Sequence, residues 1–274
     1  MKNKKINTLM ASPYLLWSVA FIIIPLFMVF YYGLTDKSGS FTFENITAIS
    51  EPEHMKALGL ALLLSLVSTV VCVLLAYPLA MILATSKVKQ DKFIIFIFIL
   101  PMWMNFLLRT LAWQTLLENT GVINTVLEFL HLPGLHIINT PWAIVLGMVY
   151  NYLPFMVLPL YNVLSKIDQN VINAARDLGA NPIQTFVRVT LPLSVPGIIS
   201  GITMVFVPAL TTFAISTFLG GGKVHLIGNI IEEEFTKASN WHLGSGLSMV
   251  LMIFIIISMI FTAIFDKDGE GTAL

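Results

Sequence analysis

The stretch Ile167–Pro192, IDQNVINAARDLGANPIQTFVRVTLP, is a long polar interruption between hydrophobic runs, and it carries the pattern of a folded segment. Asp168 is suited to cap a helix, because its side-chain oxygen can accept hydrogen bonds from the free N–H groups of a first turn. Small and apolar residues then share one helical face, at Val171, Ala174, Ala175 and Leu178. Gly179 predicts the end of this helix, since glycine adopts the left-handed conformation without steric cost.

A second helix is predicted directly after this turn. Asn181 is a suitable N-cap, and Pro182 fits the first helical turn. The apolar face continues at Ile183, Phe186, Val187 and Thr190. The sequence therefore predicts a helix–turn–helix over 168–190, placed between two membrane spans. Its apolar face is too short to cross a bilayer but long enough to dock into a groove on a partner protein.

The composition of the chain indicates an integral membrane protein. Of its 274 residues, 57% are hydrophobic and 11% are charged, whereas soluble domains carry about 25% charged residues. Most of the chain must therefore face lipid or other apolar helices. The single cysteine, Cys72, excludes an internal disulfide. We therefore expect membrane lipid to surround the chain, and we expect no nucleic-acid partner.

Hydrophobic runs long enough to cross a bilayer recur six times, because a membrane-spanning helix needs about 20 apolar residues. The predicted spans are 9–32, 58–84, 93–116, 141–164, 193–219 and 243–265. The sequence therefore predicts an all-α fold with six transmembrane helices in a single transmembrane domain, 1–274.

Six spans place both termini on the same side of the membrane, and the distribution of Lys and Arg orients them. One side carries ten basic residues: Lys2, Lys4, Lys5, Lys87, Lys89, Lys92, Lys166, Arg176, Arg188 and Lys267. The other side carries four: Lys37, Lys56, Lys223 and Lys237. Cytoplasmic loops are the richer in Lys and Arg, so both termini and the 168–190 segment are expected in the cytoplasm.

Several aromatic and neutral polar side chains lie inside the predicted spans: Trp103, Asn105, Tyr150, Tyr152, Thr211 and Thr212. Aromatic faces attract ammonium groups by about 0.5–2 kcal/mol, and amides and hydroxyls can replace part of a solute's hydration. Glu232 and Glu233 follow in the next outer loop, where acidic groups attract cations. We expect these eight residues to line a path for a solute, although helix packing alone also explains each one singly.

Arg109 is the one charged side chain inside the predicted third span. We expect it to extend to the outer interface or to pair with an outer acid. No pair of acids and no His/Glu cluster lies within a span. The sequence therefore predicts no catalytic residue, no metal site and no intramembrane proton relay.

The helix–turn–helix also resembles the EAA loop of ABC-importer permeases, a motif written E-A-A-x(3)-G-x(9)-I-x-L-P. The matching residues are Asn173, Ala174, Ala175, Gly179 and the run Val189–Pro192, with Asn173 where the family usually has glutamate. The resemblance implies that this loop is cytoplasmic and that its helix binds in a cleft of an ATP-hydrolysing subunit. The coupling residues that follow are Asp168, Asn173, Ala174, Ala175, Asp177, Gly179, Pro182 and Pro192.

Further stretches resemble the spermidine/putrescine branch of these permeases: Pro101–Arg109, Leu153–Tyr161, Ala174–Ala180 and Leu226–Ile231. The resemblance implies a MetI-like type I importer fold in a bacterial cytoplasmic membrane. It implies an assembly with an ATPase dimer, a second permease subunit and an extracytoplasmic polyamine-binding protein. ATP and Mg²⁺ would bind to the ATPase, so this chain is expected to hold no cofactor and to be no enzyme.

Other functions stay open at this stage. The same type of permease could carry another cationic or neutral solute. An ion-coupled carrier without an ATPase, or an integral membrane enzyme, would belong to another class; the lack of intramembrane acids and of clustered ionisable residues argues against both.

Overall fold

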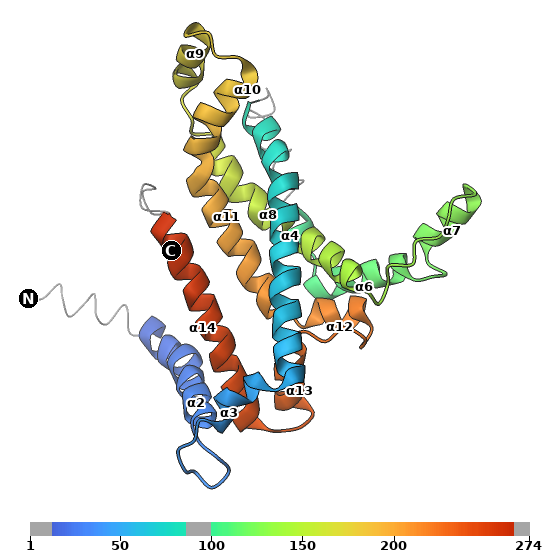
Figure 1. Cartoon of the computed structure of the whole chain (residues 1–274), viewed down its shortest axis with the longest axis vertical. Helices are drawn as coiled ribbons and strands as arrows, with labels where there is room; N and C mark the ends of the chain where they lie inside the picture. The colour runs from blue at the N-terminus through green and yellow to red at the C-terminus, as the bar shows by residue number, and fades with distance from the viewer. Residues whose placement is uncertain (1–12, 86–99, 266–274) are drawn as a thin grey trace, which may run out of the picture. The chain divides into compact units, whose positions relative to one another are not determined.

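The computed structural model describes residues 13–85 and 100–265, and these residues are almost entirely helical (Figure 1). The first part holds a π-helical segment η1 (Val19–Ile23), α2 (Ile24–Gly33), α3 (Glu44–Thr47), a 3₁₀ turn η2 (Ala48–Ser50) and α4 (Pro52–Thr85). The second begins with a 3₁₀ turn η4 (Leu100–Trp103), α6 (Phe106–Leu117), α7 (Val122–Phe129), α8 (Pro141–Leu164), α9 (Gln169–Asp177) and α10 (Pro182–Thr185). It ends with a π-helical segment η5 (Phe186–Thr190), α11 (Leu191–Thr211), α12 (Ala214–Gly220), α13 (Ile227–Thr236) and α14 (Trp241–Phe265).

Five helices of the described residues are long and apolar enough to cross a membrane. They cover Pro13–Gly33, Pro52–Ala84, Pro141–Leu164, Pro182–Thr211 and Trp241–Ile264. These confirm the all-helical membrane fold and correspond to five of the six predicted spans. Exposed side chains on them are largely apolar, such as Leu74 and Ile257, as helices that face lipid require.

The expected third span, 93–116, differs from the structure. Residues 93–99 lie outside the described residues, and the rest is not one continuous helix. The chain leaves helical geometry at Asn105, with φ −56° and ψ 128°, and α6 starts afresh at Phe106. The Asn105 side-chain oxygen accepts hydrogen bonds from the N–H groups of Leu107 and Leu108, at 2.9 and 3.3 Å. This amide caps the new helix, which compensates for the break.

The predicted fifth span, 193–219, also has different limits. Its helix already starts at Pro182 and runs through η5 into α11. Pro192 cannot donate to the carbonyl four residues earlier, and the π-helical hydrogen bonding of η5 absorbs this interruption. At the outer end, Thr212 is extended, with ψ 137°, and separates α11 from α12. The second helix of the predicted helix–turn–helix is therefore the start of a membrane helix.

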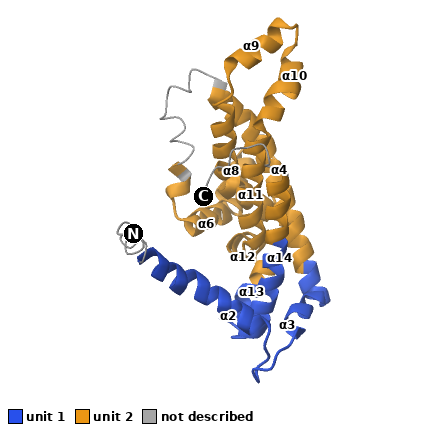
Figure 2. Cartoon of the chain, turned by 90° about the vertical axis from the view of Figure 1, so that its left-hand side faces the viewer, with its two compact units in different colours: residues 1–56, 230–254 blue, residues 57–229, 255–274 orange. Residues whose placement is uncertain are grey.

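The chain divides into two compact units (Figure 2). One comprises residues 1–56 and 230–254, and the other comprises residues 57–229 and 255–274. In the first unit, the Asn45 amide donates to the Thr35 carbonyl at 2.9 Å, and His242 Nδ1 contacts the same oxygen at 2.6 Å. These bonds tie the end of α2 to the start of α14. The single transmembrane domain expected for 1–274 stays a prediction.

The packing of α8 against α11 forms the centre of the larger unit. Gly197 and Gly201 are both buried, and they let the α11 backbone approach α8 closely. A Cβ at Gly197 would lie 3.0 Å from the Pro159 carbonyl oxygen. Glycines four residues apart are suited to such a close approach of membrane helices. Large side chains such as Met156 and Leu160 are fully buried in the same layer.

Replacing Gly197 with leucine tests this packing. The new side chain would meet backbone and the β-branched Val163, which leave little room to move. We expect a loss of stability of about 1–3 kcal/mol, as for an overpacked core. The measurement is the thermal unfolding midpoint of the protein purified in detergent. Gly59→Leu on α4 is the matched control, because nothing lies within 4 Å of its Cβ position; equal midpoints for both variants would contradict the packing argument.

Candidate coupling segment and substrate path

The first helix of the 168–190 segment is built as the sequence predicts. The Asp168 side chain accepts from the Asn170 N–H at 2.9 Å and caps α9. At the other end, Gly179 has φ +85°. The Gly179 N–H donates to the Arg176 carbonyl at 2.8 Å, and the Ala180 N–H donates to the Ala175 carbonyl at 3.1 Å. This pair of bonds is a Schellman motif, which satisfies the last carbonyls of the helix.

The turn into α10 is closed by a reciprocal pair of hydrogen bonds. Asn181 Oδ1 accepts from the Gln184 N–H at 2.8 Å, and Gln184 Oε1 accepts from the Asn181 N–H at 3.0 Å. This is a capping box, with Pro182 in the first turn. The predicted roles of Asn181 and Pro182 are confirmed, so the segment has a defined shape without a partner.

Part of the predicted apolar face of this segment is exposed, whereas Phe186 and Thr190 are only partly exposed. Leu178 is 89% exposed and Ile183 is 74% exposed, and Val171 and Val187 are about half exposed. Asn173, Ala174 and Asp177 are also exposed, and Ala175 is partly exposed. The buried residue of α9 is instead Ile172. Exposed leucine and isoleucine on a rigid, capped segment are suited to bind a partner protein.

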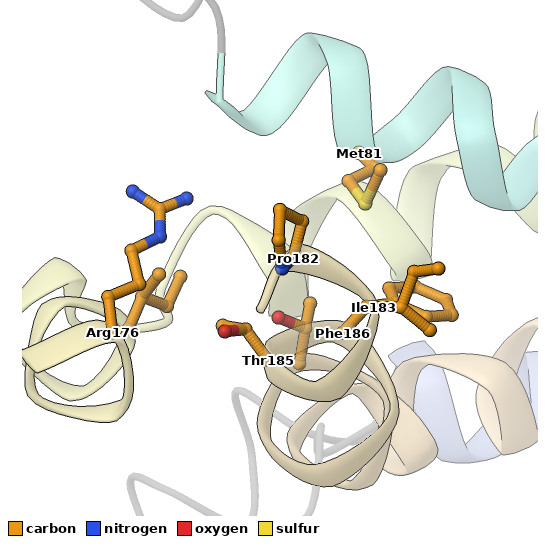
Figure 3. Close-up of a pocket in the computed structure, with 8 residues that line it drawn as sticks. Met81, Arg176, Pro182, Ile183, Thr185 and Phe186 are labelled. Carbon is orange, nitrogen blue, oxygen red and sulfur yellow. The ribbon is translucent and has the colours of Figure 1, made fainter. Parts of the chain in front are cut away.

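Behind the exposed face lies a cavity of about 430 Å³ (Figure 3). It is bounded by α9, by the start of the long helix that includes α10, and by the end of α4. Its lining is mostly apolar and consists of Met81, Ile172, Arg176, Pro182, Ile183, Thr185, Phe186 and Thr190. The Arg176 side chain extends from α9 at one side of this lining. The cavity thus separates part of α9 from the end of α4.

An aromatic contact connects the 168–190 segment to α4. The rings of Tyr77 and Phe186 meet edge to face, with centroids 5.5 Å apart. The Tyr77 hydroxyl also hydrogen-bonds the Ser194 hydroxyl at 2.8 Å, and both groups are buried. These two contacts join the start of the long helix to α4.

The predicted path residues are only partly gathered in one place. Tyr152 and Thr212 are both buried, and the Tyr152 hydroxyl donates to the Pro208 carbonyl at 3.3 Å. Pro208 lies in the last turn of α11, directly before the break at Thr212. The structure thus brings a tyrosine hydroxyl, a threonine and a helix break together.

Other predicted path residues make local contacts. Asn105 caps α6, and the Thr211 hydroxyl donates to the Val207 carbonyl at 3.1 Å. Trp103 is 75% exposed. Tyr150 lies at the surface of the chain and meets Trp113 edge to face at 5.2 Å. Exposure on a single chain is compatible with a path that a second subunit completes; the role of these residues stays a prediction.

Glu232 and Glu233 belong to the smaller unit, on α13. Glu233 pairs with Lys237 at 2.8 Å, and this carboxylate raises the pKa of the Lys237 ammonium by accepting its hydrogen bond. Glu232 accepts a hydrogen bond from the Thr236 hydroxyl at 3.0 Å. Both acids are partly exposed, but a lysine already offsets part of the charge that was expected to attract cations.

Two residues have roles that the sequence reasoning missed. Asn229 fills the break between α11 and α12: its oxygen accepts from Ser216 and the Leu226 N–H, and its nitrogen donates to the Phe213 carbonyl and Thr217. The only sequence signal for this role of Asn229 was an asparagine that lies next to a predicted turn.

Arg109 is 6% exposed rather than extended to the outer interface. The reason is that α6 packs against α8 and α12.

Comparison with known proteins identifies the family. The family model described as "Binding-protein-dependent transport system inner membrane component" matches residues 76–268. The spermidine/putrescine transport system permease protein PotB of Haemophilus influenzae is 37% identical over 92% of this chain and 93% of its own. PotB of Escherichia coli strain K12 is 36% identical over 86% of this chain and 89% of its own.

Solved structures agree on the fold. A chain of a bacterial alginate ABC transporter, in complex with an alginate-bound periplasmic protein, superimposes with a TM-score of 0.81. The alignment covers 100% of this chain and 98% of that chain at 16% identity. At such low identity the likeness supports the fold alone. Taken together, the helical architecture, the matched family model and the similarity to PotB show that this chain belongs to the inner-membrane permeases of binding-protein-dependent ABC transport systems.

Proposed function

We propose that this permease carries polyamines, of the spermidine and putrescine class, inward across the cytoplasmic membrane of a bacterium as one subunit of an ATP-driven importer. Both PotB relatives are named for this transport and resemble nearly the whole chain. Neutral polar and aromatic groups near Tyr152 suit a solute that carries several ammonium groups and must pass without being held tightly. The acids on α13 add to this preference at the outer end.

The observation that supports ATP coupling is the preformed segment between Asp168 and Pro192. Its caps hold Leu178 and Ile183 in water, while Phe186 holds its other side against Tyr77. We infer that an ATPase dimer binds the exposed face, where Asn173, Ala174, Ala175 and Asp177 also lie. Closure of the ATPase then moves α10, α11 and α4, since a subunit transmits a change only if it contacts the two states differently.

The remaining partners follow from the same proposal. A second permease subunit completes the path, and an extracytoplasmic binding protein delivers the polyamine. The alginate transporter of similar fold is itself complexed with a periplasmic protein. ATP and Mg²⁺ bind to the ATPase, and this chain holds no cofactor and contributes no catalytic residue. Both termini and the coupling segment lie in the cytoplasm, as the Lys and Arg distribution predicts.

Transport of labelled spermidine and putrescine into vesicles with the full assembly tests the substrate. We expect uptake that requires ATP and the binding protein and that persists when ion gradients are collapsed. If the ATPase associates but no polyamine is taken up, the chain is still an importer subunit, but its solute is another cationic or neutral molecule. Uptake that is independent of the ATPase but lost with the ion gradient would favour the ion-coupled carrier.

Gly179→Asp tests the coupling segment. An L-residue at φ +85° is strained, and a carboxylate at the negative end of α9 is repelled by the helix dipole, each by about 1 kcal/mol. We expect the variant to insert in the membrane and to lose ATP-dependent uptake. Gly39→Asp is the matched control, because Gly39 has φ +83° and nothing within 4 Å, but lies in an outer hairpin. Normal uptake by an assembled Gly179→Asp variant would refute the coupling role.

Leu178→Glu tests the docking face more directly. Removing the most exposed apolar side chain of the segment should lower the amount of ATPase that co-purifies by about tenfold, as for an interface hot spot. Asn173→Glu adds the same charge to the same helix without removing an apolar contact. We expect this control to retain the ATPase; equal losses in both variants would show that charge, and not the leucine, is what matters.

A further inference from the structure

Arg109 is a buried cation for which the described residues offer no counter-charge. Its side chain is 6% exposed, and Nε is enclosed without a hydrogen-bond acceptor. Among residues 13–85 and 100–265, the ion pairs are His54 with Glu51 and Lys237 with Glu233. An unpaired charge in an apolar interior is strongly unfavourable. A charged residue inside a membrane domain is therefore expected to have a partner.

No described residue forms an ion pair with Arg109, and the group identified near it is neutral. The guanidinium lies within electrostatic range of the Tyr152 hydroxyl, which donates its own hydrogen to Pro208. Tyr152 is the twelfth residue of α8, so its backbone lies about 16 Å along the helix from Pro141. The phosphate groups of lipids lie at the ends of the spans, about 15 Å from the bilayer centre. The position of Arg109 therefore favours a protein carboxylate over a lipid phosphate.

The surface beside Arg109 is open to another subunit. Three residues lie on one side of Arg109, within about 100° around the helix axis. They are Asn105, the N-cap of α6, and Leu108 and Ala112 within α6. All three are exposed, and Leu108 is 63% exposed. Ala112 is small enough to let another helix approach closely. A helix along this strip could bring an acidic side chain to the guanidinium.

We propose that Arg109 forms an ion pair with a carboxylate of the second permease subunit, whose helix packs along the Asn105–Leu108–Ala112 strip of α6. This inference rests on the proposed assembly with a second permease, and it names the chemistry of that contact. The pair sets the register between the two subunits near Tyr152 and the break at Thr212. Buried ion pairs of this kind are suited to specify which partner binds, because loss of one member leaves the other charge unpaired.

Co-purification of the second permease with tagged Arg109 variants tests the pair. Arg109→Gln should reduce the co-purified subunit by about tenfold or more, as expected when one member of a buried pair is removed. Arg109→Lys keeps the charge and should retain most of the subunit. Lys223→Gln removes a charge from an exposed outer loop and is the matched control. Wild-type retention by Arg109→Gln would overturn the proposal.

A charge exchange identifies the partner residue and guards against misfolding of the glutamine variant. In an Arg109→Glu background, each Asp and Glu in the membrane helices of the second permease is changed to Lys in turn. One exchange should restore both co-purification and uptake; restoration by none would overturn the ion pair. If the wild-type chain binds neither a second permease nor an ATPase, the proposed assembly itself fails. If the wild type assembles and Arg109→Gln does too, only the ion pair fails.

Discussion

The need to satisfy backbone hydrogen bonds in an apolar surrounding governs this structure. Lipid offers no partner for a free N–H or carbonyl, so the described chain is helical wherever it crosses the membrane region. Two breaks in helical geometry have side-chain partners. Asn105 caps the helix that restarts at Phe106, and the Asn229 amide donates to the Phe213 carbonyl at the break after α11. Before Pro25 and Pro192 the helix widens into π geometry, because each proline lacks the N–H that a regular helix requires.

The same requirement explains why the turn between α9 and α10, at the start of a membrane helix, has a defined shape. A Schellman motif and a capping box use the polar groups at its turn, so few backbone groups depend on a partner. Leu178 and Ile183 stay exposed. Phe186 contacts Tyr77 on α4, and Tyr77 also hydrogen-bonds Ser194 on α11. A surface that is ordered before binding loses less entropy on association. Under the proposed coupling, it would also transmit a displacement to the membrane helices.

The residues expected to line a solute path carry different charges in the two units. In the smaller unit, Glu232 and Glu233 are acidic, and Lys237 pairs with Glu233. In the larger unit, the described buried groups near Tyr152 are neutral except for Arg109. A fixed cation there repels an ammonium solute, and a carboxylate from a second subunit would cancel that repulsion.

Much of this protein could be predicted from local patterns alone. Long apolar runs determine that helices cross a membrane, and Asp168, Gly179, Asn181 and Pro182 determine the coupling segment, because caps and turns depend on residues close in sequence. Tertiary structure decided the rest. The break at Asn105 lies within an apolar run, and no local signal shows that Asn229 compensates the break at Thr212. Likewise, α8 and α12 bury Arg109, although its side chain is long enough to extend toward water. Such outcomes depend on which distant groups meet, and sequence spacing does not determine that.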